Sequence, residues 1–486
     1  MGASHIPSCC LFLLLCSFCP PVAARVQSDD GGFISALVTE KGLDFARDLL
    51  VDQAIHSLVP LRLHDMEKSF RIPFIGEIHA EVSNITLLHI EVSSSTIQPG
   101  DSGVVIVASG AVANLSMDWY LSYSTWLGPF VISDRGRASV RVEGMEVGLT
   151  LSMENQEGSL KLTVLDCGCY MEAILIRLEG GASWFYQGFV NAFEDQIRAA
   201  VETAIKKKTT EGISKLDSFL RSLPKEIRVD DIVSLNVTFV DEPLLGNSSI
   251  EFYIDGIFIE TNKAVVSNSM HKNSQPSILC EGPLPMLGIS LDEAVFNSAS
   301  VTYFKAGQMT WIVDKVPDQT LLNTAGWRFI IPQLYRKYPN DEMKLNISLT
   351  SPPTIKISKQ KIDATIFSDM TVDVLDADET VPVACISMIV MASGVPEISG
   401  NNLAGRIALQ DFTLNLKWSK IGNFHMSLIQ GVMRAFLNNV FIPYVNTRLR
   451  KGFPLPIIHG FTVQNANILS SDSRIVVCTD LMFTKY

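Results

Sequence analysis

Two segments of this chain, residues 183–208 and 424–452, show the apolar period of a long α-helix. Their apolar residues recur every four positions: Phe185, Phe189, Phe193, Ile197, Val201 and Ile205 in the first segment, and Leu428, Val432, Phe436 and Val440 in the second. Both segments follow long runs of alternating apolar and polar residues, which are typical of antiparallel strands. Because an apolar stripe must be covered, the pattern predicts a sheet packed on each helix.

The elements around these two helices follow a similar order in both halves. Residues 41–58 have helical periodicity that stops before Pro60, and residues 331–339 form a shorter helix candidate. Residues 285–323 begin with strand-like sequence. Together these patterns predict an α+β fold of two units, each a curved antiparallel sheet wrapped around a long helix.

The chain is rich in apolar residues for a protein that folds in water. Its 486 residues suffice for two to four domains, and 47% are apolar whereas 19% are charged. This composition favours either large cores or cavities that hold apolar ligands. A curved sheet around an apolar helix can leave a gap for a lipid chain, but the periodicity alone fits a filled core better, because protein interiors pack densely.

Residues 1–24 have the features of a cleavable secretory signal, although no Lys or Arg precedes their apolar run. This run is too short for a transmembrane helix. We therefore expect a secreted, extracellular glycoprotein. Five Asn-x-Ser/Thr sequences agree with export and are candidate glycosylation sites: Asn84, Asn114, Asn236, Asn247 and Asn346.

Five cysteines follow the expected signal: Cys167, Cys169, Cys280, Cys385 and Cys478. Because they are few and widely spaced, they do not form a dense disulfide framework. One of them must stay free or pair outside the chain, and the spacing leaves the pairing open.

The negative charge of the chain lies in its first half. Residues 25–270 contain 20 basic and 34 acidic side chains, whereas residues 271–486 contain 19 and 17. The short basic run at 206–208 is typical of a solvated helix end. Since no basic groove is indicated, nucleic acid is not an expected partner.

The sequence contains no motif of a catalytic or metal-binding site. It lacks the nucleophile elbow Gly-x-Ser-x-Gly, the zinc motif His-Glu-x-x-His, a phosphate-binding loop and a dinucleotide fingerprint. The acidic run at 373–380 does not have the spacing of a calcium loop. Cys167-Gly168-Cys169 matches neither a zinc pair nor a thioredoxin motif. We expect neither an enzyme nor a bound metal or cofactor.

Several stretches carry a family resemblance. The most specific are residues 337–358 and 450–456, and residues 41–46, 143–151 and 287–307 agree with them. They resemble the family of bactericidal/permeability-increasing protein and lipopolysaccharide-binding protein, to which lipid transfer proteins are related. The likeness extends from Lys41 to the C-terminus. The five sequons, the few cysteines and the acidic balance look more like plant members than animal ones.

The resemblance implies a two-barrel boomerang in which a central antiparallel sheet joins the barrels, with a lipid pocket on the concave side of each. The implied divisions are a signal peptide (1–24), an N-terminal barrel (25–232), a central sheet and linker (233–283), a C-terminal barrel (284–453) and return strands (454–486). The family analogy and the apolar stripes of the two long helices together suggest which residues line the pockets. These are Phe189, Phe193 and Ile197 in the N-terminal barrel and Val432, Phe436 and Val440 in the C-terminal barrel.

The sequence departs from animal members of this family in its cysteines. Those members join a cysteine before the long N-terminal helix to one near the end of that helix. Cys167 or Cys169 matches the first position, but the second falls near residues 206–212, which contain no cysteine. The family disulfide is therefore expected to be lost or replaced, and a Cys167–Cys169 bridge is disfavoured because its ring would be small and strained.

A second departure concerns the tip of the N-terminal barrel, where antibacterial animal members gather lysines that bind the phosphates of lipid A. The corresponding positions keep only Arg62, Lys68 and Arg71, which we predict to form a reduced phosphate clamp. The adjacent stretch 117–130 is aromatic, and we hypothesise that Trp119 and Trp126 insert into lipid aggregates. The alternative is that Trp119 and its alternate neighbours cover a barrel end.

The resemblance implies a secreted lipid-binding protein of innate immunity that binds lipopolysaccharide through lipid A, with bacterial membranes or lipid aggregates as its target. The alternative function is a carrier of phospholipid or other apolar ligands without a bacterial target. The missing lysines favour the alternative, and the end-to-end likeness favours lipopolysaccharide.

Overall fold

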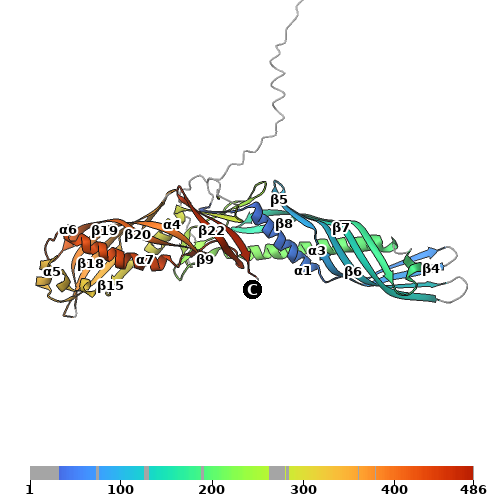
Figure 1. Cartoon of the computed structure of the whole chain (residues 1–486), viewed down its shortest axis with the longest axis horizontal. Coiled ribbons are helices and arrows are strands. Elements are labelled where there is room, and N and C mark those ends of the chain that lie inside the picture. Colours follow the sequence, from blue (N-terminus) through green and yellow to red (C-terminus); the bar gives the residue numbers. More distant parts are fainter. Residues whose placement is uncertain are drawn as a thin grey trace, which may run out of the picture.

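A computed structural model of the protein describes residues 32–72, 76–124, 131–187, 191–261, 280, 284–359, 361–377 and 379–484. The molecule is elongated, with one lobe at each end and sheets between them (Figure 1). The N-terminal lobe contains the helices α1 and α3, and the C-terminal lobe contains α5, α6 and α7. This arrangement confirms the α+β fold with two sheet-and-helix units.

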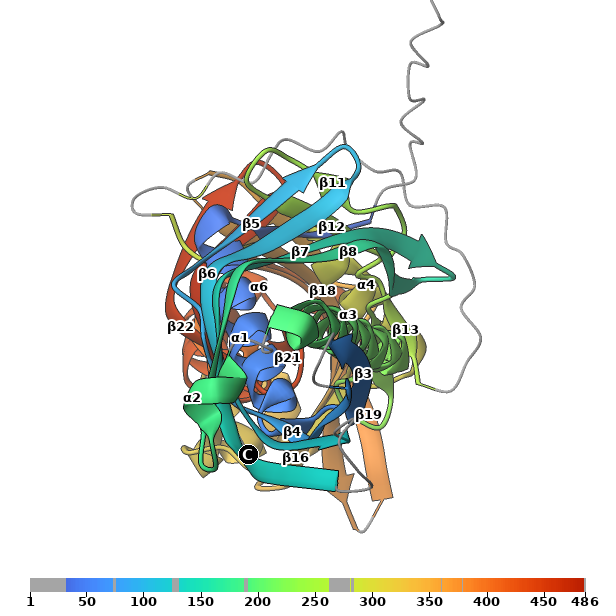
Figure 2. The ribbon, with the colours of Figure 1, turned by 90° about the vertical axis from the view of Figure 1, so that its right-hand side faces the viewer.

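The N-terminal lobe is a curved antiparallel sheet with the strand order β2–β4–β6–β7–β8, to which β3 adds on β4 and β5 on β6. The strands are β2 (Leu61–Arg62), β3 (Met66–Ile72), β4 (Gly76–Glu91), β5 (Ser94–Gly100), β6 (Gly103–Ser124), β7 (Val131–Gln156) and β8 (Ser159–Glu179). Viewed along the molecule, this sheet curves around α1 and α3 (Figure 2).

Helix α1 (Glu40–Leu58) confirms the helix expected at 41–58. It starts at Thr39, whose side-chain oxygen accepts a hydrogen bond from the Gly42 N–H at 3.4 Å, as an N-cap residue does. The chain leaves the helix through Val59 and reaches β2 after Pro60, which cannot continue a helical hydrogen-bond ladder.

The predicted helix at 183–208 is divided into α2 (Ser183–Tyr186) and α3 (Asn191–Ser222). The apolar stripe of α3 is confirmed, because Phe193, Ile197, Val201 and Ile205 are all buried in the core of the N-terminal lobe. The helix continues 14 residues beyond the predicted end at 208. The basic run at 206–208 therefore lies inside α3 and not at a helix end, because buried Ile213 extends the apolar contact into a second cluster.

Two smaller sheets lie between the lobes. One has the order β11–β12–β1–β14–β23–β22 and the other β13–β10–β9. Their strands are β1 (Ile34–Val38), β9 (Glu226–Arg228), β10 (Val233–Asn236), β11 (Leu244–Leu245), β12 (Ile250–Ile254), β13 (Phe258–Glu260), β14 (Leu287–Asp292), β22 (Phe461–Ser471) and β23 (Arg474–Phe483). The first described strand and the last one thus meet in one sheet. The domain boundaries given above stay a prediction.

The C-terminal lobe has the strand order β15–β16–β18–β19–β20–β21, with β17 on β18. Its strands are β15 (Thr310–Val313), β16 (Glu342–Leu349), β17 (Thr354–Ile357), β18 (Ile362–Asp376), β19 (Glu379–Ser399), β20 (Asn402–Ser419) and β21 (Phe453–Pro454). Two short 3₁₀ helices, η2 (Gln319–Leu322) and η3 (Thr324–Trp327), precede α5 (Pro332–Lys337), which confirms the short helix candidate.

Residues 293–305, which lie in a segment that begins as a strand, form the helix α4 (Glu293–Lys305). Its N-cap is Asp292, whose carboxylate accepts a hydrogen bond from the Ala294 N–H at 2.9 Å. Because α4 precedes the C-terminal sheet as α1 precedes the N-terminal one, the two halves share the order helix, sheet, helix.

The second long helix is continuous but irregular. It consists of α6 (Met426–Phe436), a π-helical turn η4 (Leu437–Phe441) and α7 (Ile442–Leu449). A π turn adds a residue to the helical repeat and rotates the positions that follow it. The predicted apolar stripe is also wrong before this turn: Leu428 is 57% exposed, because the buried row of α6 runs through Ile429, Met433 and Phe436.

A single disulfide among the described cysteines joins Cys280 to Cys478 across 198 residues of sequence. Cys167, Cys169 and Cys385 are free, in agreement with the expectation that Cys167 and Cys169 do not bridge. Cys478 belongs to β23, so the bond fastens the segment before β14 to the central sheet. Within the described residues, no helix is both long and apolar enough to cross a membrane.

Candidate functional site

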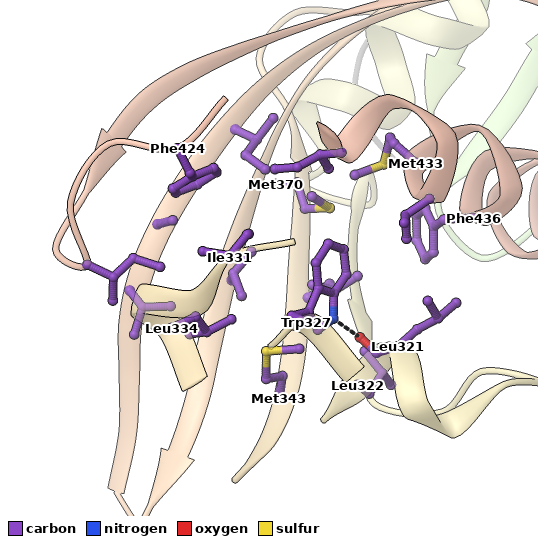
Figure 3. Close-up of a pocket in the computed structure, with 18 of the residues that line it drawn as sticks. Leu321, Leu322, Trp327, Ile331, Leu334, Met343, Met370, Phe424, Met433 and Phe436 are labelled. Atoms are coloured by element: carbon purple, nitrogen blue, oxygen red, sulfur yellow. Dashed lines mark hydrogen bonds between the residues drawn. The ribbon is translucent and has the colours of Figure 1, made fainter. Parts of the chain in front are cut away.

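The C-terminal lobe contains a small apolar cavity of about 50 Å³ between its sheet, α6 and the segment that carries η2, η3 and α5 (Figure 3). All of its lining side chains are apolar or aromatic, among them Trp327, Ile331, Phe424 and Phe436. The indole N–H of Trp327 donates a hydrogen bond to the Leu321 carbonyl at 2.9 Å, so its one polar atom is satisfied beside the cavity. A void with such a lining stays dry and favours apolar ligands.

This cavity is smaller than the 300–1,000 Å³ that is typical of a pocket for a complete small ligand. Three buried methionines, Met343, Met370 and Met433, are part of its wall. Methionine is unbranched and adopts many rotamers at low cost, so it can repack around a guest. The arrangement is therefore suited to an apolar chain that enters as these side chains move.

The structure places two of the three predicted C-terminal pocket residues at this cavity. Val432 and Phe436 are part of its lining. Val440 packs against the same core but is not part of the lining, because it lies in the π turn that rotates the helix surface. Trp327, Met343 and Met370 could not be predicted as lining residues, because they come from elements that apolar periodicity does not link to the long helix.

A second cavity, of about 30 Å³, lies in the N-terminal lobe and is lined by residues that include Phe193, Tyr186 and Trp119. Ile197, another predicted pocket residue, is fully buried in the same core but does not line this cavity. Phe189 lies outside the described residues. The residues predicted to line an N-terminal lipid pocket therefore belong mainly to a filled core.

The hypothesis that Trp119 inserts into lipid is contradicted by its position. Its side chain is 3% exposed and packs against Tyr186, with ring centroids 5.6 Å apart. The indole N–H points between two strands, at 3.0 Å from the Arg137 carbonyl and 3.2 Å from the Glu179 carbonyl. Trp119 thus covers the end of the sheet from inside, as the alternative held. Trp126 lies outside the described residues.

The predicted phosphate clamp of Arg62, Lys68 and Arg71 is also not assembled. Arg62 pairs with Thr86 and Arg71 with Glu77, so the two arginines lie nine positions apart along β4, or roughly 30 Å. The Lys68 ammonium donates to the Ala192 carbonyl of α3 at 2.8 Å. Lys68 and Arg71, at odd spacing on one strand, also point to opposite faces of the sheet.

The free thiols Cys167 and Cys169 lie on β8 near α3. The charge of Lys206 on α3 acts to lower the pKa of both thiols, but burial outweighs it and raises both. Burial raises the pKa of Cys169 to about 11, and the charge of Glu202 acts in the same direction. At neutral pH this thiol is protonated and therefore a poor nucleophile.

The five candidate glycosylation sites differ in their exposure. Asn84, Asn247 and Asn346 are exposed, and Asn114 is half-buried. Asn236 is 4% exposed, and its side-chain oxygen accepts hydrogen bonds from the N–H and the hydroxyl of Thr238. In the folded protein Asn236 is therefore not accessible to a glycosylating enzyme.

No group of three or more His, Cys, Asp or Glu side chains in the described part of the chain is arranged to hold a metal ion. The apolar cavity of the C-terminal lobe is the best candidate for a functional site because its whole lining is apolar or aromatic.

Comparison with known proteins agrees with this architecture. The model of the LBP/BPI/CETP family, N-terminal domain, matches residues 42–216, and the model of its C-terminal domain matches residues 227–483. The chain belongs to the LBP/BPI/CETP family. This family contains lipid-binding proteins, and the likeness predicted from the sequence is thereby confirmed.

Relatives of the LBP/BPI/CETP family match over nearly the whole chain. A BPI/LBP family protein of Arabidopsis thaliana is 55% identical and covers 98% of this chain and 97% of its own length. The bactericidal permeability-increasing protein of Sebastes schlegelii is 25% identical, with coverage of 93% and 95%. The human lipopolysaccharide-binding protein is also 25% identical, with coverage of 94% and 93%.

The crystal structure of a lipopolysaccharide-binding protein superposes on this chain with a TM-score of 0.65 at 18% identity. It covers 94% of this chain and 100% of its own. The match confirms the boomerang fold of the LBP/BPI/CETP family.

Proposed function

We propose that this protein binds lipids by taking an acyl chain into the cavity of the C-terminal lobe. The observation that carries the proposal is the lining of this cavity, which is apolar throughout and includes the adaptable Met343, Met370 and Met433. Burial of an acyl chain there gains about 0.8 kcal/mol for each methylene group that leaves water. No reaction is part of this proposal, so the protein acts as a binder and not as an enzyme.

The ligand proposed first is lipopolysaccharide, bound through its lipid A part, in a role in innate immunity and antibacterial defence. Its support is the full-length likeness to proteins named for lipopolysaccharide binding and for bactericidal activity. Bacterial membranes or lipid aggregates would then be the source of the ligand.

A second candidate is phospholipid carriage without a bacterial target. The dispersal of Arg62, Lys68 and Arg71 favours it, because phosphates of lipid A need several converging cations for tight binding. Both candidates use the same cavity and differ in how the headgroup is recognised.

We also propose that the protein is secreted and glycosylated. The disulfide between Cys280 and Cys478 supports an oxidising compartment, in which such bonds persist. The exposed sequons Asn84, Asn247 and Asn346 are the proposed glycan acceptors, whereas Asn236 is not, because it is buried.

Uptake of lipid at low and high salt tests the proposal and separates its two ligands. The protein is incubated with lipid A or with phosphatidylcholine, separated from free lipid, and extracted. Acyl burial is not screened by salt, so a bound lipid should stay bound at high salt, whereas contacts with phosphate weaken. Retention of neither lipid at either salt concentration contradicts the proposal.

A further inference from the structure

The far end of the C-terminal lobe combines two stretches that both border the apolar cavity. Residues 327–338 run from the last residue of η3 through α5, and residues 418–434 run from the end of β20 into α6. The first contributes Trp327, Ile331 and Leu334 to the cavity wall, and the second contributes Phe424 and Ile429. The Lys337 ammonium also donates to the Lys420 carbonyl at 3.4 Å. We call residues 327–338 and 418–434 the C-terminal end surface (Figure 1, near α5 and α6).

Large apolar side chains on this surface face water. Phe329 is 81% exposed, Leu428 is 57% exposed and Trp418 is more than one-third exposed. Phe329 has a higher exposed fraction than any other large apolar residue in the described part of the chain. A soluble protein gains nothing from such exposure, and an exposed aromatic residue beside an apolar cavity indicates a surface that is covered during function.

The charge of the C-terminal end surface is opposite to that of the whole chain. Its two stretches contain five basic residues, Arg328, Arg336, Lys337, Lys420 and Arg434, and no Asp or Glu, although the chain has a net charge of −12. The next acidic residues after the first stretch border this surface: Asp341 bonds with Thr324 of η3, and Glu342 begins β16. Positive charge on this surface is therefore local and not a property of the protein surface in general.

Each of the two stretches carries a cation beside an aromatic ring. The Arg328 guanidinium lies 4.5 Å from the centroid of the Phe329 ring, and the Lys420 ammonium lies 5.7 Å from the Trp418 ring. Aromatic rings flanked by Arg or Lys suit the boundary between phosphate headgroups and acyl chains, because the rings enter the apolar layer while the cations stay at the phosphates.

We propose that the C-terminal end surface docks this protein on an anionic phospholipid surface. Phe329 and Leu428 enter the layer below the headgroups, and Arg328, Lys337 and Lys420 contact the phosphates. The surface borders the cavity, so a lipid that leaves the layer reaches the cavity without crossing water. This last step rests on the proposed lipid binding, whereas docking itself does not. The docking end is thus opposite to the N-terminal tip, where Trp119 is buried and the arginines are dispersed.

Flotation with lipid vesicles tests this proposal. The full-length secreted protein is mixed with vesicles of phosphatidylcholine containing phosphatidylglycerol, or of phosphatidylcholine alone. The protein should float with the anionic vesicles and less with the neutral ones. Phe329→Ser should weaken binding about tenfold or more, since an inserted ring contributes at least one tenfold step in affinity. Replacing Arg328 and Lys337 together by Ser should remove the preference for anionic vesicles.

Tyr170→Ser is the matched control, because Tyr170 is an aromatic residue that is 63% exposed on β8 of the N-terminal lobe. It should float like the unchanged protein, and all variants should have the same thermal midpoint. Docking is overturned if Phe329→Ser binds like the unchanged protein, if Tyr170→Ser loses as much, or if the unchanged protein does not float with anionic vesicles. Lipid extraction from the same preparations distinguishes docking from lipid binding. Phe329→Ser should keep its bound lipid although it docks less. If the protein floats but contains no lipid, only the proposed lipid-binding function is contradicted.

Discussion

The indole ring of Trp119 on β6 lies over the backbone of Gly136 on β7, so closely that a Cβ atom at position 136 would be 2.8 Å from the ring. The same Cβ would be 2.2 Å from the Glu179 carbonyl oxygen of β8. Only glycine at position 136 leaves room for the indole ring of Trp119 between β6, β7 and β8. This relationship explains why an aromatic residue near the end of a hairpin is buried.

Gly136→Ala should lower the free energy of unfolding by about 1–3 kcal/mol, because the new methyl group forces the ring or the backbone to move. The matched control is Gly148→Ala on the same strand, where an added Cβ meets no atom within 4 Å. Urea unfolding followed by tryptophan fluorescence measures both. Equal stability of the two variants would show that Trp119 does not depend on Gly136.

Filling the C-terminal cavity should reduce lipid binding. Val432→Phe places a larger side chain in the lining of a void of about 50 Å³ and leaves less room for an acyl chain. The expected result is less lipid extracted per protein, at a small change in stability. Val395→Phe, the same substitution at a position that is 51% exposed on β19, is the control and should retain the lipid. An unchanged lipid content in Val432→Phe would place the ligand elsewhere.

Loss of the disulfide should destabilise the protein. Cys280 and Cys478 close a loop of 198 residues, and opening a loop of this length removes up to about 5 kcal/mol in the chain-entropy account. Cys478→Ser should therefore lower the thermal midpoint of unfolding. A reductant should lower the midpoint of the unchanged protein by a similar amount. Cys167→Ser, which removes a free thiol, should have little effect. A reductant that leaves the midpoint of the unchanged protein in place would count against a stabilising bond.

Stability should also fall in acid through Asp480. The Lys41 ammonium, which donates to its carboxylate at 2.7 Å, lowers the pKa of Asp480. A carboxyl with a lower pKa in the folded state stabilises the fold above its unfolded pKa, near 4, and this contribution is lost as the pH falls through the folded pKa. The pair is partly exposed, so its contribution is below about 1 kcal/mol.

Unfolding by urea at neutral pH and below pH 4 checks this link between α1 and β23. Asp480→Asn should be less stable at neutral pH, and the difference from the unchanged protein should shrink in acid. Lys41→Met should reproduce part of the effect. If the difference in stability between Asp480→Asn and the unchanged protein grows in acid, the pKa of Asp480 is not lowered in the folded state.

Helices were predictable from the sequence where one apolar stripe persists. Phe193, Ile197 and Val201 recur at helical spacing, and they are buried as expected. In β6, alternation grouped Trp119 with Leu121, which is buried, and Tyr123, which packs on the same core, and this signal favoured the covered position over insertion. Lipid insertion was inferred from aromatic content, which does not specify the face of a strand.

Other features had weaker signals or none in the sequence. Helix α4 was missed although Asp292 is a typical N-cap residue, because the strand before it continues the alternation. The π turn has no marker in local periodicity, so the absence of Val440 from the cavity wall could not be predicted. Leu428 precedes this turn, and its exposure was not predictable because Ile429 and Met433 have the same four-residue spacing as Leu428 and Val432. The cavity wall combines Trp327, Met370 and Met433 from three separate elements, and only the tertiary fold brings these residues together.

The central claim is that the protein binds a lipid by taking an acyl chain into the C-terminal cavity, and native mass spectrometry of the secreted protein tests it most directly. The protein is measured after incubation with lipid A or phosphatidylcholine, beside the Val432→Phe variant. We predict a species heavier than the polypeptide and its glycans by the mass of a lipid, which is reduced in Val432→Phe. Detection of the lipid-free mass alone, under conditions in which the protein stays folded, would contradict the claim.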